Sequence, residues 1–175
     1  DYREGDHLTG YFTIVCNQRE CRLPFDVQFE TEHLYASIGE IATLEDFATL
    51  AQGHWSEAMQ LFYAAPFEKF ISRQEKTVQM VYTGYRKALP TAANLEEFLV
   101  AVGVKDAVDF TVRERKEAFY RVTENRKETL VIAKNTWGHI EIAVESDSPF
   151  VTVEKDVITT DYFLGSTMLL NYYIH

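Results

Sequence analysis

Apolar and polar residues alternate along the first part of the chain in the way that half-buried strands require. Two such runs, between residues 8 and 30, are separated by a short polar segment, which predicts an antiparallel β-hairpin. We expect the turn at Gln18 and Arg19, a placement that would put Cys16 opposite Cys21. A cross-strand disulfide is then geometrically allowed, but two cysteines make no disulfide framework, and two free thiols are favoured.

The apolar spacing changes to three and four residues between residues 43 and 103. This period predicts four main helices, with a short turn at 67–71, in a helical segment spanning 33–104. Thr43 followed by Asp46, and Asn94 followed by Glu97, are typical of capping boxes at helix starts. The positions expected to share the buried stripe of these helices are Trp55, Phe62, Val81, Tyr85, Phe98 and Leu99.

After Lys105 the period returns to two. Short strands are expected at 108–112, 119–122, 130–133, 140–144, 150–153 and 168–174. Several short strands at this spacing favour an immunoglobulin-like β-sandwich over 105–175. The predicted fold class is therefore α+β, with immunoglobulin-like sandwich strands, an N-terminal hairpin over 1–32 and a four-helix segment between them.

Composition narrows the range of partners. The chain has 175 residues, of which 46% are hydrophobic, so it can bury a core. Its formal net charge of -10 repels polyanions, and neither nucleic acid nor an anionic membrane is an expected partner. No apolar run approaches the roughly 18 to 20 residues that span a bilayer, and a cytoplasmic location is expected.

Several short motifs occur together. They include GYFTIVCN at 10–17, SIGE at 37–40, KNTWG at 134–138 and DYFLG at 161–165. With them the chain resembles the N-terminal region of a family of very large, uncharacterised clostridial-type bacterial proteins. The resemblance implies tandem immunoglobulin-like domains with a helical insert, and it brings no known activity, cofactor or catalytic residue.

The same resemblance implies that residues 8–29 close one sandwich and that residues 131–174 belong to a second, truncated one. The chain begins at Asp1 without a methionine, and we expect it to be an excised part of a longer protein. The edge beside 168–174 is then expected to be open, so that the first hairpin or a second chain would cover it.

Few residues are placed to carry chemistry. His54 and Glu57 lie one helical turn apart, a spacing that suits an acid-base pair or half of a metal site. No third ligand accompanies them, so an ordinary helix surface is favoured. Asp147, Asp156 and Asp161 lack the spacing of a calcium loop, which favours solvated turn aspartates. We expect no metal and no cofactor.

Aromatic residues suggest the main alternative. Trp137 on a turn, with Tyr172 and Tyr173 near the end of the chain, could stack on sugar rings, although core packing is favoured for each of them. We therefore predict a non-catalytic structural or protein-interaction module of a large multidomain bacterial protein, not an enzyme. Its expected partners are another protein, other domains of the same chain or a second copy paired at an open strand edge. The alternative is a carbohydrate-binding β-sandwich module.

Overall fold

The computed structural model describes residues 7–28, 33–113 and 122–175. The chain divides into two units, Asp1–His33 and Leu34–His175. The predicted α+β class is confirmed, because the described residues contain five α-helices and ten strands whose ladders are all antiparallel.

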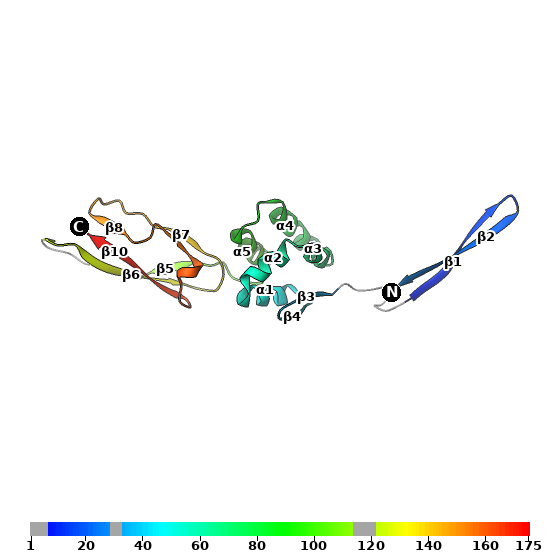
Figure 1. The fold of residues 1–175 in the computed structure, drawn as a ribbon, viewed down its shortest axis with the longest axis horizontal. Coiled ribbons are helices and arrows are strands. Elements are labelled where there is room, and N and C mark those ends of the chain that lie inside the picture. The colour runs from blue at the N-terminus through cyan, green and yellow to red at the C-terminus, as the bar shows by residue number, and fades with distance from the viewer. Residues whose placement is uncertain (1–6, 29–32, 114–121) are drawn as a thin grey trace. The chain divides into compact units, whose positions relative to one another are not determined.

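The first unit contains the predicted hairpin, formed by β1 (His7–Cys16) and β2 (Arg19–Gln28) (Figure 1). Its turn lies one residue earlier than predicted, at Asn17 and Gln18, whose φ angles are 49° and 67°. Two positive φ angles are typical of a type I′ turn, whose twist matches that of the flanking strands. Cys16 therefore pairs with Arg19, so the predicted pairing of Cys16 with Cys21 is wrong, and both thiols are free and exposed.

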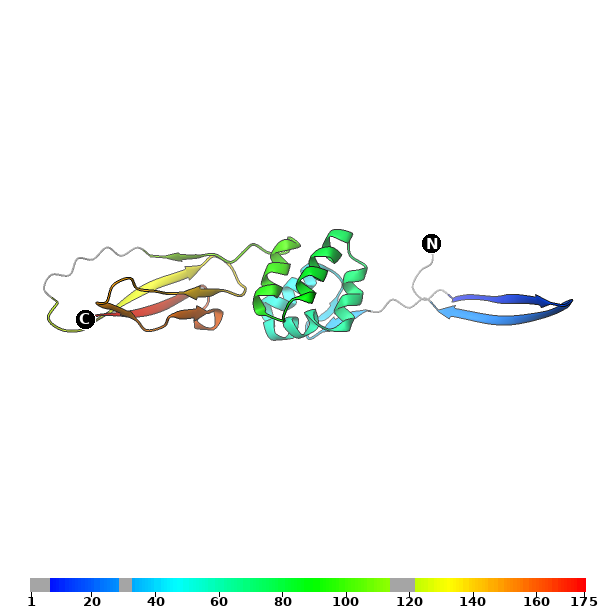
Figure 2. The ribbon, with the colours of Figure 1, turned by 90° about the horizontal axis from the view of Figure 1, so that it is seen from above.

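The helical segment opens the second unit and has five helices instead of four (Figures 1 and 2). The helices are α1 (Leu44–Gly53), α2 (Trp55–Phe62), α3 (Ala65–Ser72), α4 (Lys76–Lys87) and α5 (Ala92–Ala101). The short turn expected at 67–71 is a full helix, α3, because Pro66 lies in its first turn, where no hydrogen bond is lost. A small unpredicted hairpin, β3 (Leu34–Ala36) and β4 (Gly39–Ile41), precedes α1.

Side-chain caps set the ends of these helices. The predicted capping box between Thr43 and Asp46 is confirmed at the start of α1. The box predicted at Asn94 is wrong, because α5 starts earlier and the N–H of Asn94 donates instead to the Thr91 hydroxyl, at 3.2 Å. At its other end, Gly103 adopts a φ of 78° and completes a Schellman motif.

An aromatic core holds the helices together. The predicted stripe is confirmed, since Phe62, Phe98 and Leu99 are 0% exposed and the other three positions pack half-buried against them. The Phe62 ring lies 5.0 Å from that of Phe98 and 5.2 Å from that of Tyr82, measured between centroids. The Tyr82 hydroxyl donates to the Phe62 carbonyl at 2.8 Å, so the only polar atom of that ring is satisfied inside the core.

The remainder of the second unit is β-structure in two sheets. Its strands are β5 (Phe110–Val112), β6 (Arg126–Lys134), β7 (Glu141–Ala143), β8 (Val151–Val153), β9 (Val157–Thr159) and β10 (Thr167–Ile174), with a 3-10 turn η1 (Thr160–Tyr162) after β9. One sheet has the order β5-β6-β10-β8 and the other pairs β7 with β9. Ile132, Ile158 and Leu170 belong to a core that the two sheets share.

The immunoglobulin-like description is not confirmed by this arrangement. The described strands form sheets of four and two strands, whereas an immunoglobulin constant-type sandwich divides seven strands four to three. The strand predicted at 119–122 lies, apart from Val122, outside the described residues.

The edge predicted to be open beside the last strand is covered over its final residues only, and among the described strands none pairs with residues 168–171 on that side. β10 pairs with β6 along its whole length and with β8 over Tyr172–Ile174, so it is an interior strand of its sheet there. The short strand β8 folds back antiparallel and covers this part of the edge from within the chain.

Candidate functional site

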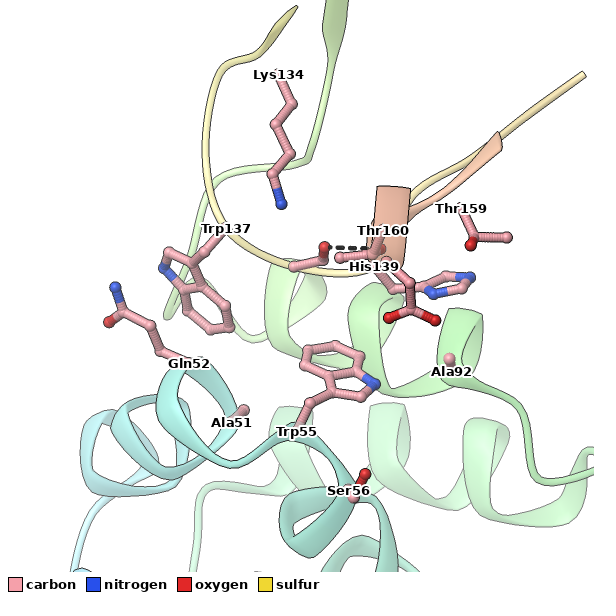
Figure 3. A pocket seen from close by; sticks show the side chains of 12 residues that line it. Ala51, Gln52, Trp55, Ser56, Ala92, Lys134, Trp137, His139, Thr159 and Thr160 are labelled. Carbon is pink, nitrogen blue, oxygen red and sulfur yellow. Dashed lines mark hydrogen bonds between the residues drawn. The ribbon is translucent and has the colours of Figure 1, made fainter. Parts of the chain in front are cut away.

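A cleft of about 540 Å³ lies where the N-terminal helices of the second unit meet loops of its β-structure (Figure 3). The sequence contains two tryptophans, Trp55 and Trp137, and both line this cleft. The other lining residues are Ala51, Gln52, Ser56, Ala92, Lys134, Gly138, His139, Thr159, Thr160 and Asp161. Both indole side chains extend into the cleft, one from the start of α2 and one from the loop after β6.

A buried carboxylate joins the helices to the loop that carries Trp137. Glu96 of α5 is buried, with 9% of its surface exposed. It forms an ion pair with Lys105, whose side chain is 1% exposed. The Glu96 Oε2 atom also accepts the backbone N–H of His139 at 2.9 Å. One side chain therefore links a helix, the segment that follows it and the loop that carries Trp137.

The same loop contains a glycine in a conformation that other residues rarely adopt. Gly138 has a φ of 124°, in the region that side chains rarely adopt. A Cβ atom there would collide with the Glu96 carboxylate and would lie 2.7 Å from the Lys105 Nζ atom. The absence of a side chain at residue 138 therefore lets the loop approach the buried ion pair without displacing it.

Two further contacts hold the loop. The Lys105 Nζ atom lies 4.9 Å from the centroid of the Trp137 ring, which is a cation–π contact, and this half-buried ring packs against the helical core. The Thr160 hydroxyl donates to the Gly138 carbonyl at 3.2 Å (Figure 3). The same hydroxyl accepts the N–H of Ile140 at 2.9 Å. The rim of the cleft is thus preorganised by contacts that use no ligand.

Three other polar side chains of the lining are available to bind a ligand. Within the described parts of the chain, the side chains of Gln52, His139 and Asp161 make no hydrogen bond. An amide, an imidazole and a carboxylate can together donate to and accept from a bound molecule. The cleft therefore combines aromatic surface with free hydrogen-bonding groups, which suits a binding site.

The sequence-predicted binding residues are distributed over two places. Trp137 lines the cleft, whereas Tyr172 and Tyr173 are half-buried on β10, cross-strand from Glu128 and Lys127, and do not line it. Sequence reasoning assigned Trp55 to the core and did not consider it for a site. It packs on the core and also lines the cleft, and its aromatic type was the only available signal.

The other candidate pair has a structural explanation. Glu57 accepts both the backbone N–H of Ser37, at 2.8 Å, and the Ser37 hydroxyl, so it anchors the β3–β4 turn to α2. These hydrogen bonds, the one from the hydroxyl foremost, hold the pKa of the Glu57 carboxyl below its usual range. His54 caps the end of α1 with its backbone N–H, which donates to Leu50 at 2.7 Å.

Residues 7–28, 33–113 and 122–175 contain no candidate metal site. Among them, no three His, Cys, Asp or Glu side chains gather in a way that could hold a metal ion. Of the three turn aspartates, Asp161 lines the cleft and Asp147 and Asp156 do not. None of the helices in the described part of the chain has the length and apolarity needed to span a bilayer.

Comparison with known protein families assigns the whole chain to one family. A family model described as the N-terminal part of a family of unknown function matches residues 1–175. The chain belongs to this family, DUF5717. The match supports one part of the predicted resemblance, namely that the chain is the N-terminal part of a family of unknown function. It gives no information on a clostridial origin or on immunoglobulin-like domains. No curated protein and no solved structure matches the chain.

Proposed function

We propose that this DUF5717 chain is a non-catalytic protein-interaction module of a larger bacterial protein, and that its N-terminal hairpin packs against the hairpin of a second copy. The observation that carries the proposal is an uncovered apolar face on the hairpin. Directly paired residues share a face of a sheet, so the register places one apolar set together. That set, called here the apolar face, is Leu8, Gly10, Phe12, Ile14, Cys16, Cys21, Leu23, Phe25 and Val27, and the charged Arg19, which pairs with Cys16, lies on the same face at its turn end.

Large side chains of the apolar face are open to solvent. Phe12 is 63% exposed, Ile14 is 52% exposed and Leu23 is 47% exposed. The described elements of this unit are β1 and β2, so among the described residues of the unit no second layer covers these side chains. An isolated two-stranded hairpin is marginally stable in water, which supports a role for an external layer.

Aromatic packing gives the apolar face a defined centre. The rings of Phe12 and Phe25 lie 4.9 Å apart between centroids. Phe25 folds across Gly10, where an added Cβ atom would lie 2.5 Å from the Phe25 ring. Glycine at this position lets the Phe25 ring lie flat against the strand. The face is therefore shallow enough there for another sheet to pack on it.

Charge favours a second copy as the occupant. Residues 7–28 contain Arg19 and Arg22 against Glu20 and Asp26, so their formal charge is 2 − 2 = 0, with His7 neutral, within a chain whose net charge is -10. The hairpin is thus a place where two acidic chains can meet without strong repulsion. Two identical faces are also self-complementary about a two-fold axis.

The size of the face predicts a weak dimer. Two strands of ten residues each, with about 3.4 Å of rise per residue and about 4.8 Å between strands, cover roughly 330 Å². Standard interfaces bury about 800 Å² per partner, which is more than twice the area of this face. The dimer should therefore be weak, and the dimer fraction should rise with protein concentration over the micromolar range and above.

Sedimentation equilibrium tests this proposal with two adjacent substitutions. We expect the wild type to associate reversibly and Phe12→Asp to be monomeric. Tyr11→Asp is the matched control, because Tyr11 is 68% exposed but lies on the opposite face of the same strand. A wild type that stays monomeric to about 1 mM, or equal effects of the two substitutions, would overturn the proposal.

A further inference from the structure

We infer that the cleft of the second unit is a binding site for a neutral sugar, and that it holds a pyranose ring against Trp55 and Trp137. This inference is independent of the hairpin. It rests on a site whose aromatic, polar and charged groups come from parts of the chain up to about a hundred residues apart.

The aromatic surface is the first requirement for such a ligand. Pyranose rings have an apolar face of C–H groups that packs on flat aromatic side chains, and tryptophan offers the largest such surface. Both indoles of the chain extend into one cleft, whose volume of about 540 Å³ lies within the roughly 300 to 1,000 Å³ usual for small-molecule sites.

The charges around the cleft favour a neutral ligand over a cationic one. Aromatic cages also bind quaternary ammonium groups, but they use the electron-rich faces of their rings. The Lys105 ammonium group already lies over Trp137 and draws on its electron density. Lys134 and Asp161 in the lining carry opposite charges, so the lining has no strong preference for either sign.

The free polar groups supply the second requirement. Sugar hydroxyls both donate and accept hydrogen bonds. Gln52, His139 and Asp161 can meet both needs, since none of them makes a side-chain hydrogen bond within the described residues. The Thr160 hydroxyl, in contrast, is occupied by the loop and serves to position the rim.

The lining favours binding over hydrolysis of the sugar. Glycoside hydrolases require two carboxyl groups placed on either side of the scissile bond. The residues that line the cleft, all of them described, include one carboxylate, Asp161. The Glu96 carboxylate, which is not among the lining residues, is engaged by Lys105 and by the N–H of His139.

Intrinsic fluorescence tests the inference directly, because both tryptophans of the chain report on the cleft. The chain is titrated with cellotetraose, tetra-N-acetylchitotetraose and maltotetraose as neutral probes and with choline as the cationic probe. We expect at least one tetrasaccharide to change the emission in a saturable way and choline to leave it unchanged. Trp55→Ala should weaken that binding about tenfold, measured by calorimetry.

Variants at the exposed rim keep the test decisive if Trp55→Ala unfolds. Gln52→Ala and Asp161→Ala remove side chains with no internal hydrogen bond, and each should weaken sugar binding roughly threefold or more. Phe150→Ala, which removes a 65% exposed ring outside the lining, should change nothing. A response to choline alone, no response to any probe at about 10 mM, or rim variants that bind as the wild type does would each overturn the inference.

Discussion

Removing the charge of Glu96 should destabilise the second unit more than any exposed charge change does. Glu96→Gln keeps the size of the side chain and one acceptor for the N–H of His139. It leaves Lys105 as a cation whose side chain is 1% exposed and which has lost its anion. Breaking a buried pair from one side in this way costs about 3 to 5 kcal/mol.

The loss of unfolding free energy can be measured by urea denaturation followed through tryptophan emission, since Trp137 contacts Lys105. In a separate thermal unfolding experiment, the expected fall in melting temperature for a unit of this size is roughly 10 °C. Glu145→Gln, at an exposed loop position, is the matched control and should lie within about 0.5 kcal/mol of the wild type.

A double variant separates the ion pair from general damage. In Glu96→Gln with Lys105→Met the buried cation is gone as well, and most of the lost stability should return, because apolar replacements of buried pairs are often neutral. The reasoning is refuted if Glu96→Gln behaves like Glu145→Gln, or if the double variant is no more stable than Glu96→Gln alone.

Three further predictions concern the same unit. Gly138→Ala should lower the free energy of unfolding by about 2 to 4 kcal/mol, because residue 138 has a φ of 124° and the ion pair crowds its Cβ position. Gly53→Ala is the control for thermal unfolding and should cause no loss, since nothing lies within 4 Å of the new Cβ. Phe98→Ala should cost about 3 to 5 kcal/mol, since the ring is 0% exposed, and an unchanged melting temperature would show that the stripe is misassigned. The hydrogen bonds from Ser37 hold the pKa of the Glu57 carboxyl below its ordinary value, so the stabilising contribution of Glu57 is complete above that ordinary value and is lost as the pH falls through the lowered pKa. Ser37→Ala should flatten this pH dependence, and a profile identical to that of the wild type would contradict the assignment.

Much of the fold follows from short-range patterns in the sequence. Alternation predicts the hairpin and most strands, and the three-to-four spacing predicts four of the five helices. Errors arose where a local signal had two meanings. A proline such as Pro66 can mark either the end of one helix or the start of the next, and it lies in the first turn of α3. The turn was misplaced because Asn17 and Gln18 both adopt positive φ, although glutamine rarely does so.

The cleft was less accessible to sequence reasoning because its parts are far apart in the chain. Glu96 and Glu97 are adjacent acidic residues on one helix, and no local pattern tells which is buried. The partner of Glu96 lies nine residues on, at Lys105, and its second contact lies at His139. The aromatic alternative named one correct side chain, Trp137, but its neighbour in the cleft is Trp55, more than eighty positions earlier.

Hydrogen exchange of the β1 and β2 amides, followed at increasing protein concentration, tests the proposed interaction module most directly. If the apolar face pairs with a second copy, the cross-strand amides of residues 7–28 should exchange rapidly in dilute solution and become protected as the concentration rises. The Phe12→Asp chain should show no such rise, and the Tyr11→Asp chain should follow the wild type. Protection of the wild-type hairpin that is the same at every concentration would contradict the account.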